Sequence, residues 1–550
     1  MSPKSSFLAD SSFDKLEDTI PKTVLKQYPT YPILRIGFME GYEKIDFRVS
    51  GEFTITDLEG NPIFSEVKSH LKWRSLLDQA HGATFIYCVL VTACRGEAHA
   101  IETVERLKRL YPQVRMQRIG GQLVISGQMV NDNTKYRILA GAFETEAEAK
   151  KLSQKFIDSY APRVIREKVK ESSGQIEVYD AEYDYSAMIE DGFRIEPLSE
   201  ETTVTLYGVK VGSGFNWESM ADRTYRGTVE VRIGNDARLC AISEIPIDRY
   251  LKGVVPAEMP AGYPLEALKS QAVAARSDVL AKFGTKHLND PFDFCANVHC
   301  QVYSGTTVET ENTNKAVELT FGETLYYDDR ICDAVYSAVC GGHTEHKHNV
   351  WNPPEEAYLT GKYDTKNPKA FHLDLSQEKD ARKWIEDRPD VHCSLNQDDL
   401  PAVLSYSRKY FRWEVSYARK ELEDIIKKRT GDDIGTLYDI IPLERGISGR
   451  LNEIEILGSR KNMRIKKELN IRRALSQTYL RSACFVIDIE VDQIGTPMAF
   501  TFKGAGWGHG VGMCQIGAAV MALNKIKYRD ILKHYYSNTE IRQIYEAPKP

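Results

Sequence analysis

Two groups of residues in this 550-residue sequence could carry chemistry, and the first is a single acid. Glu258 stands between Pro256 and Pro260, with no cation beside it in the sequence. Since an apolar setting raises the pKa of a carboxyl group, Glu258 could hold a proton near neutral pH and act as a general acid. The alternative is a solvated loop glutamate, because most glutamates lie at protein surfaces.

The second group combines four possible metal ligands within fourteen residues: His287, Cys295, His299 and Cys300. Zinc prefers thiolate and imidazole ligands, and four protein ligands close a tetrahedral site with no open position. The loop has little apolar content, so a metal would supply the energy that orders it. We therefore predict a structural zinc here, with a Cys295–Cys300 disulfide or free thiols as the alternative.

Helical periodicity surrounds Glu258 on both sides. Apolar residues recur at helical spacing from Ile247 to Val254, and Pro256 ends that pattern because it lacks an N–H group. A second helix with a buried stripe is expected from Pro264 to Leu280. Glu258 is therefore predicted to lie in a short connection between two packed helices.

Alternation of apolar and polar residues predicts strands in two separated stretches, residues 31–64 and 203–242. We expect these stretches to form one β unit with a piece inserted between them. The inserted piece repeats a strand–helix–strand pattern, which predicts an antiparallel α+β sandwich over residues 78–168. Residues 163–200 are charged and mixed, and we interpret them as a linker with some strand content.

The chain as a whole is predicted to be a multidomain α+β protein. The expected divisions are an N-terminal β segment (30–75), the inserted sandwich (78–168), a core in two parts (200–374 and 481–545) and a subdomain inserted into that core (375–480). Hydrophobic content of 42% and charged content of 27% fit an ordinary globular protein. The net charge of −6, without a basic run, argues against a nucleic-acid partner.

Three features bear on location and redox state. The stretch 1–22 is polar, so we expect neither a signal peptide nor a membrane anchor there. The longest apolar run, residues 83–94, is too short to span a bilayer, and no transmembrane segment is expected. The ten cysteines are scattered, which argues against a small disulfide-stapled fold.

Three motifs, in the same order, resemble those of the SpoIID/LytB family. The first runs from Tyr250 to Glu258 and continues from Leu268 to Arg276, the second runs from Tyr336 to Glu345, and the third runs from Gly506 to Ala518. The resemblance covers most of the chain from Thr202 to Ile541 and implies a SpoIID-like core of mixed strands and helices. It also implies a peptidoglycan lytic transglycosylase in which Glu258 is the catalytic acid.

Three functions stay open at this point. The first is cleavage of the MurNAc–GlcNAc β-1,4 bond with formation of 1,6-anhydroMurNAc ends. The second is that of a non-enzymatic amidase enhancer, which binds peptidoglycan and stimulates a cell-wall amidase. The third is hydrolysis by Glu258 together with Glu345, because a standard glycosidase needs two carboxylates. Only one carboxylate, Glu258, lies within the first of the three motifs, and this favours the first function.

The resemblance also implies a groove that binds the glycan. Its candidate contacts are Gln271, Arg276, Gln301, Tyr303, Ser337, Gly341, Gly342, Thr344, Glu345, His509 and Gln515. The pair of glycines would let a ligand approach the backbone closely. Some family members carry a zinc site of two histidines and two cysteines near the cluster described above, and longer members carry a subdomain like residues 375–480.

The inserted piece resembles a SPOR domain, a module that binds glycan strands stripped of their stem peptides. The strand from Tyr136 to Phe143 and the glutamate-rich helix after it carry this resemblance. The alternative is an interaction module for another ligand. The implied partners are peptidoglycan glycan strands and a cell-wall amidase, and the implied location is the cell envelope, which conflicts with the expected lack of a leader.

Overall fold

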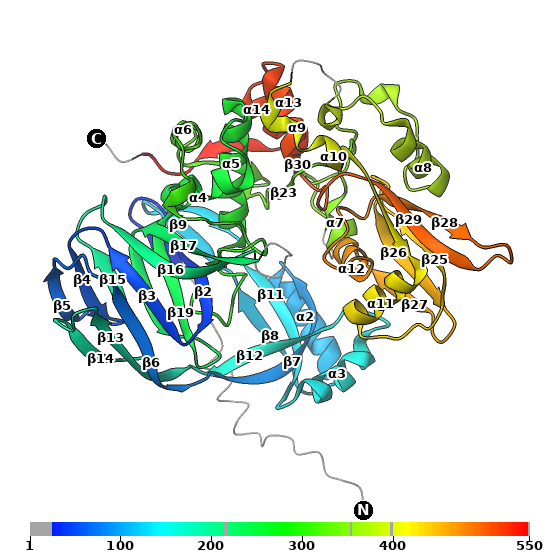
Figure 1. Cartoon of the computed structure of the whole chain (residues 1–550). Helices are drawn as coiled ribbons and strands as arrows, with labels where there is room; N and C mark the ends of the chain where they lie inside the picture. Colours follow the sequence, from blue (N-terminus) through cyan, green and yellow to red (C-terminus); the bar gives the residue numbers. More distant parts are fainter. Residues whose placement is uncertain (1–24, 213–217, 352–354, 396–399, 548–550) are drawn as a thin grey trace, which may run out of the picture.

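The computed structural model describes residues 25–212, 218–351, 355–395 and 400–547 (Figure 1). The N-terminal half contains two large β sheets. One has seven strands in the order β20-β2-β19-β18-β15-β4-β5, and the other has six in the order β14-β13-β6-β3-β16-β17. Their strands are β2 (Ile33–Tyr42), β3 (Lys44–Val49), β4 (Phe53–Asp57), β5 (Pro62–Val67), β6 (Trp73–His81), β13 (Ser173–Asp180), β14 (Ser186–Glu190), β15 (Gly192–Pro197), β16 (Thr203–Val211), β17 (Ser219–Arg226), β18 (Thr228–Ile233), β19 (Leu239–Pro246) and β20 (Phe294–Cys295).

These two sheets pack face to face as a β sandwich. Phe38 on β2 stacks on Tyr225 of β17 with ring centroids 4.2 Å apart, and Phe53 on β4 lies edge-on to Trp73 of β6 at 5.6 Å. The expected union of the two β stretches is confirmed, because β2 pairs with β19 and β3 pairs with β16. The strand content expected in residues 163–200 is confirmed, but these residues are not a linker, since β13 to β15 belong to this sandwich.

The inserted piece is an α+β sandwich, as predicted. An antiparallel sheet of order β12-β7-β11-β8 carries two helices on one face. The elements are β7 (Thr84–Cys94), α2 (Glu97–Lys108), β8 (Val114–Ile119), β11 (Lys135–Phe143), α3 (Glu146–Ser153) and β12 (Arg163–Lys170). The hairpin of β9 (Gln122–Ile125) and β10 (Gln128–Asp132) leaves this sheet to pair with β1 (Lys26–Tyr28). Just after it, Asn133 Nδ2 donates to the Ala281 carbonyl at 3.1 Å, which attaches the module to the core.

Helix α5 (Leu265–Lys282) is the centre of the helical core. It packs against α4 (Ile247–Glu258), α6 (Glu311–Glu318), α13 (Gln515–Leu523) and α14 (Tyr528–Tyr535). The expected end of the first helix at Pro256 is wrong. The Met259 N–H donates to the Val255 carbonyl at 2.9 Å, and α4 continues to Glu258 because the proline removes only one hydrogen bond of its last turn.

The inserted subdomain has its own hydrophobic core, built from the sheets β24-β29-β28 and β25-β26-β27 with α11 and α12. Its elements are α8 (Glu378–Asp387), β24 (Arg412–Ala418), α11 (Arg419–Thr430), β25 (Leu437–Arg445), β26 (Leu451–Gly458), β27 (Met463–Lys466), α12 (Glu468–Ala474), β28 (Phe485–Val491) and β29 (Pro497–Ala505). The expected boundary at residue 480 does not divide the structure, because β29 pairs with both β24 and β28.

Short strands bring the later motifs back to the helical core. β23 (Tyr336–Ser337) pairs in parallel with β30 (Met513–Cys514), so the second and third motifs lie side by side. β21 (Glu323–Tyr327) lies between β22 (Arg330–Ile331) and β31 (Glu540–Gln543). Among the described residues, no helix has the length and apolar character needed to cross a membrane.

Candidate functional site

Glu258 is the last residue of α4, and its side chain is partly buried. The backbone N–H of Val302 donates to Glu258 Oε1 at 3.2 Å. Burial raises the pKa of Glu258 to about 7, and the charge of Asp278 adds to the rise, whereas the Val302 N–H and Gln515 favour the ionised form. The expectation of a raised pKa is therefore confirmed, and this carboxyl group can exchange a proton near neutral pH.

The three motifs converge around Glu258. Gln515, the first residue of α13, donates from Nε2 to Oε1 of Gln271 on α5 at 3.2 Å, and its side chain also reaches Glu258. Burial raises the pKa of Tyr336 on β23, and the charge of the adjacent Glu258 is the next cause. Sequence analysis did not select Tyr336 as a site residue, although it opens the second motif.

Gln301 and Tyr303 hold the backbone that contacts the acid. The Gln301 amide donates to Asp278 Oδ2 at 3.2 Å, and the Tyr303 ring packs on α4. Both side chains are buried, and Val302 between them supplies the N–H that reaches Glu258. These two residues were expected to contact the glycan. In the structure they instead support the backbone that contacts Glu258.

Arg276 is a core residue, which corrects its assignment as a groove contact. Its side chain is fully buried and forms an ion pair with Asp248 on α4, with Nη2 and Oδ1 2.5 Å apart. Its Nη1 donates to the Glu323 carbonyl at 3.0 Å, and the Tyr545 hydroxyl donates to the other Asp248 oxygen at 2.7 Å. A guanidinium held in this way inside the core has no contact with a glycan.

The glycines of the second motif serve packing rather than approach of a ligand, which is a second correction. Gly341 and Gly342 have φ angles of 81° and 103°, a backbone region that favours glycine. A Cβ atom on Gly342 would lie 2.7 Å from the Trp384 ring, so the absent side chain lets α8 pack closely. Thr344 is buried too, and its hydroxyl hydrogen bonds with the Lys362 backbone.

Glu345 does not offer a second catalytic carboxylate. It is 1% exposed, and its oxygens accept four hydrogen bonds from the backbone and side chains around it. The shortest are from the Ser448 hydroxyl at 2.6 Å and from the His346 backbone N–H at 2.8 Å. These contacts hold the carboxylate between the second motif and the inserted subdomain, which gives Glu345 a structural role there.

His509 and Ser337 lie where the second and third motifs meet. His509 Nδ1 accepts a hydrogen bond from the Val511 N–H at 3.0 Å, and burial lowers the pKa of the ring to about 4, so it is neutral near pH 7. The Ser337 side chain is buried, and among the described residues its hydroxyl finds no hydrogen-bond partner. The Ser337 hydroxyl is thus buried and unpaired within the part of the chain that the structure describes, and its role as a glycan contact stays a prediction.

One exposed tryptophan lies within the third motif and a second packs on it, and sequence analysis selected neither as a site residue. Trp507 is 37% exposed, and its ring centroid lies 4.1 Å from that of Tyr410. Trp351 is 38% exposed, and its ring lies 4.9 Å from His509. Aromatic rings with one face in solvent can pack on the apolar face of a ligand. The signal that could have found Trp507 is its place between two glycines of the motif.

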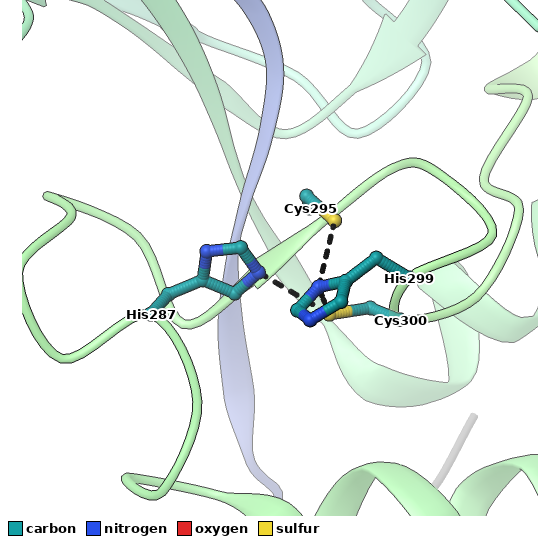
Figure 2. Close-up of side chains that lie close together, drawn as sticks. All are labelled: His287, Cys295, His299 and Cys300. Atoms are coloured by element: carbon teal, nitrogen blue, oxygen red, sulfur yellow. Dashed lines mark hydrogen bonds between the residues drawn. The ribbon is translucent and has the colours of Figure 1, made fainter. Parts of the chain in front are cut away.

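The four predicted metal ligands come together in the loop that follows α5 (Figure 2). His287 Nε2 lies 3.3 Å from Cys300 Sγ, and His299 Nδ1 lies 3.7 Å from Cys295 Sγ and 3.5 Å from Cys300 Sγ. In a tetrahedron with zinc–sulfur bonds of about 2.3 Å and zinc–nitrogen bonds of about 2.0 Å, the sulfur–nitrogen edges measure about 3.5 Å. The donor set and its spacing therefore fit a zinc ion.

Two further observations agree with this fit. Cys295 and Cys300 are both free cysteines, so the disulfide alternative is not present in the structure. Asp290 Oδ2 lies 2.8 Å from the other ring nitrogen of His287. A carboxylate in that position orients a metal-binding histidine and fixes which nitrogen faces the ion.

Comparisons with known proteins place the first motif in a known family. Residues 235–327 match the family described as Stage II sporulation protein, and residues 345–512 match one described as a domain of unknown function (DUF8618). An uncharacterized protein of Brachyspira hyodysenteriae is 30% identical over 317 residues, which cover 58% of this chain and 72% of that relative. The chain belongs to the SpoIID/LytB family.

Two relatives with functional names are also similar. The amidase enhancer of Bacillus subtilis is 31% identical over 300 residues, which cover 53% of this chain and 40% of that protein. Stage II sporulation protein D of the same organism is 25% identical over 325 residues, which cover 55% of this chain and 76% of the relative. The chain thus spans less than half the length of the amidase enhancer.

Proposed function

We propose that the protein is a peptidoglycan lytic transglycosylase that cleaves the MurNAc–GlcNAc β-1,4 bond. The observation that carries the proposal is the partly buried Glu258 carboxyl group, whose pKa is about 7 and which lies where the three motifs meet. A general acid needs a group that still holds its proton near the working pH. The family resemblance assigns the catalytic acid to the same residue.

In the proposed reaction, protonated Glu258 donates its proton to the glycosidic oxygen, and the bond between that oxygen and C1 of MurNAc breaks. The 6-hydroxyl of the same MurNAc then attacks C1 and gives its proton to the Glu258 carboxylate. The product is a 1,6-anhydroMurNAc end, and no water is consumed. This route needs one carboxylate, whereas a glycosidase needs two. The buried and fully hydrogen-bonded state of Glu345 supports the route with one.

Mass analysis of purified glycan strands after incubation with the protein tests this reaction. We expect 1,6-anhydro ends from the wild type and none from Glu258→Gln, because the amide keeps the shape and lacks a transferable proton. The control is Glu318→Gln, which changes an exposed glutamate on α6 and should cleave like the wild type. Reducing ends would identify a hydrolase, and intact strands would exclude cleavage by this chain.

The second candidate function is that of a non-enzymatic amidase enhancer, because a relative with 31% identity carries that name. In this function the groove around Glu258 would bind glycan, and a separate cell-wall amidase would cut the stem peptide. A mixed assay with a purified amidase separates the two functions. An enhancer raises amidase turnover and keeps this effect in Glu258→Gln, whereas a transglycosylase forms anhydro ends without any amidase.

We also propose a structural zinc ion bound by His287, Cys295, His299 and Cys300. The spacing of the donor atoms supports it. When bound, the ion would order the loop that leads directly to Val302, whose N–H contacts Glu258. With four protein ligands the ion has no open position, so it has a structural role and takes no part in bond cleavage.

The inserted α+β module is proposed to bind glycan strands as a SPOR domain would, and so to keep the core on its substrate at the cell envelope. Its sheet of four strands with two helices on one face supports the resemblance. A second binding site raises the local concentration of substrate without changing the chemical step. Peptidoglycan stripped of stem peptides by an amidase should retain the full chain better than untreated wall, and equal retention contradicts the assignment.

A further inference from the structure

A second cluster of metal-binding residue types lies at the base of the inserted subdomain, apart from the His287 loop. It consists of Cys340, Asp364, Cys393 and Cys514, whose donor atoms all lie within 4.8 Å of one another. Each of these four side chains is at least nine-tenths buried, and all three cysteines are free. Cys340 follows β23, Cys514 ends β30, and Cys393 lies in the turn His392–Ser394.

The spacing of the donor atoms is that of a tetrahedral metal site. The sulfur atoms of Cys340 and Cys393 are 3.7 Å apart, and Cys340 Sγ lies 3.2 Å from Asp364 Oδ2. With metal–sulfur bonds of about 2.3 Å, the sulfur–sulfur edge of a tetrahedron measures about 3.8 Å. A disulfide would need the two sulfur atoms at about 2.0 Å. The observed distance therefore fits two ligands of one ion and not a covalent pair.

Backbone N–H groups point at the sulfur atoms of the cluster. The Cys340 N–H lies 3.2 Å from Cys514 Sγ, the Gly517 N–H lies 3.4 Å from the same sulfur, and the Gly342 N–H lies 3.4 Å from Cys340 Sγ. Cys514 also caps the N-terminus of α13, where the helix dipole favours negative charge. These donors stabilise thiolates, the form of cysteine that binds metal.

The two carboxylate oxygens of Asp364 have different surroundings. Oδ1 lies 3.1 Å from His534 Nε2 and accepts from the Tyr535 hydroxyl at 2.9 Å, while Oδ2 faces the cysteines. Asp364 is fully buried, and among the described residues it has an ion pair with neither lysine nor arginine. His534 beside Oδ1 compensates the buried carboxylate only when it is protonated, whereas a cation bound beside Oδ2 would do so directly.

We propose that Cys340, Asp364, Cys393 and Cys514 bind a zinc ion. Three thiolates and one carboxylate form a closed donor set, and soft sulfur ligands in tetrahedral geometry select zinc over calcium, magnesium or manganese. Ionisation of the ligands is coupled to binding, so the negative charge of the buried site appears only together with the cation. The site has no open position, and its role is structural.

The proposed ion would connect separate parts of the chain close to Glu258. Cys340 and Cys514 lie on either side of residues 345–512, the stretch that matches a separate family, and Asp364 and Cys393 lie within that stretch. The ion therefore joins the base of the inserted subdomain to the core. Cys514 immediately precedes Gln515, which contacts Glu258, so the ion also fixes the start of α13, where this contact is made.

Zinc content of the full chain tests the site. Elemental analysis should find about two zinc ions per wild-type chain, one in each cluster, and about one in Cys393→Ser. The control is Cys332→Ser, which changes a buried free cysteine outside both clusters and should keep both ions. One ion in the wild type, or an unchanged content in Cys393→Ser, would overturn the proposal.

A second measurement needs no variant and covers the case in which Cys393→Ser fails to fold. X-ray absorption of the wild type at the zinc edge should give about 2.5 sulfur neighbours per zinc, the average of two in the His287 loop and three in this site. A value of about two, or a Cys340–Cys393 disulfide found by mass spectrometry without reduction, would refute the second ion. Because these readouts involve no glycan, they are independent of the proposed cleavage.

Discussion

The raised pKa of Glu258 makes one contribution to the stability of this protein depend on pH. Between pH 4.5, the ordinary value, and about pH 7, the folded state holds the Glu258 proton and the unfolded chain releases it. The stability that this proton contributes is fully present below pH 4.5, falls as the pH rises, and is lost above pH 7. The Glu258→Gln variant has no such proton and therefore lacks this loss.

The size of the effect follows from the pKa. One pKa unit corresponds to about 1.4 kcal/mol, so a rise from 4.5 to about 7 amounts to about 3 kcal/mol in total. Between pH 5 and pH 8 the wild type should lose about 2.5 kcal/mol of stability relative to Glu258→Gln. Comparing the two proteins at both pH values removes any constant effect of the substitution on packing.

Amide hydrogen exchange of the α4 and α5 segment, residues 247–282, is the suitable assay. A chain of several domains need not unfold in one step, and exchange reports the free energy of opening at this segment. Rates must be corrected for the pH dependence of intrinsic exchange. Glu318→Gln is the matched control, since an exposed ion pair of this kind is worth about 0–1 kcal/mol. A difference between wild type and Glu258→Gln that does not grow with pH would refute the raised pKa.

The same pKa sets the pH profile of the proposed cleavage. If protonated Glu258 is the acid, the rate should fall about tenfold between pH 6 and pH 8, following the protonated fraction. Glu258→Gln should lose between about a hundredfold and ten-thousandfold of the rate at pH 6. Activity of the variant within a few fold of the wild type would remove Glu258 from the mechanism.

Three further predictions concern other residues. Arg276→Met should lower the free energy of opening of residues 247–282, measured by amide hydrogen exchange, by about 3–5 kcal/mol, because it leaves Asp248 buried without its partner. Arg330→Met at an exposed pair should cost less than about 1 kcal/mol, and equal losses would contradict the buried pair. His299→Ala should lower the zinc content by about one ion per chain in elemental analysis, and an unchanged content would exclude His299 as a ligand. Trp507→Ala should weaken retention on purified glycan strands while zinc content and circular dichroism stay at wild-type values, and full retention would exclude its ring as a glycan contact.

Elements whose pattern is local could be predicted from the sequence. Helical spacing around Glu258 gave both helices of the first motif, and alternation gave the strands that unite residues 31–64 with 203–242. Ile176, Glu177 and Val178 alternate as a strand should, so strand content in residues 163–200 could be expected. That this strand joins the β sandwich could not, because β13 pairs with β6, a distant partner that no local pattern reveals. The boundary at residue 480 failed because β29 pairs with β24, a partner that no local pattern reveals.

The sequence by itself singled out Glu258 and four possible metal ligands as candidates. Glu258 is marked by its apolar neighbours together with the family resemblance, and the four residues of the His287 loop fall within fourteen positions, so their residue types and spacing suffice to select them. Only the tertiary structure decided that Arg276 and Glu345 are buried and satisfied in the core. It alone brought Cys340 to Cys514, which lie 174 positions apart. Residue types state which chemistry is available, whereas burial and the nearest charges depend on which distant segments pack together, and these set each group's pKa and role.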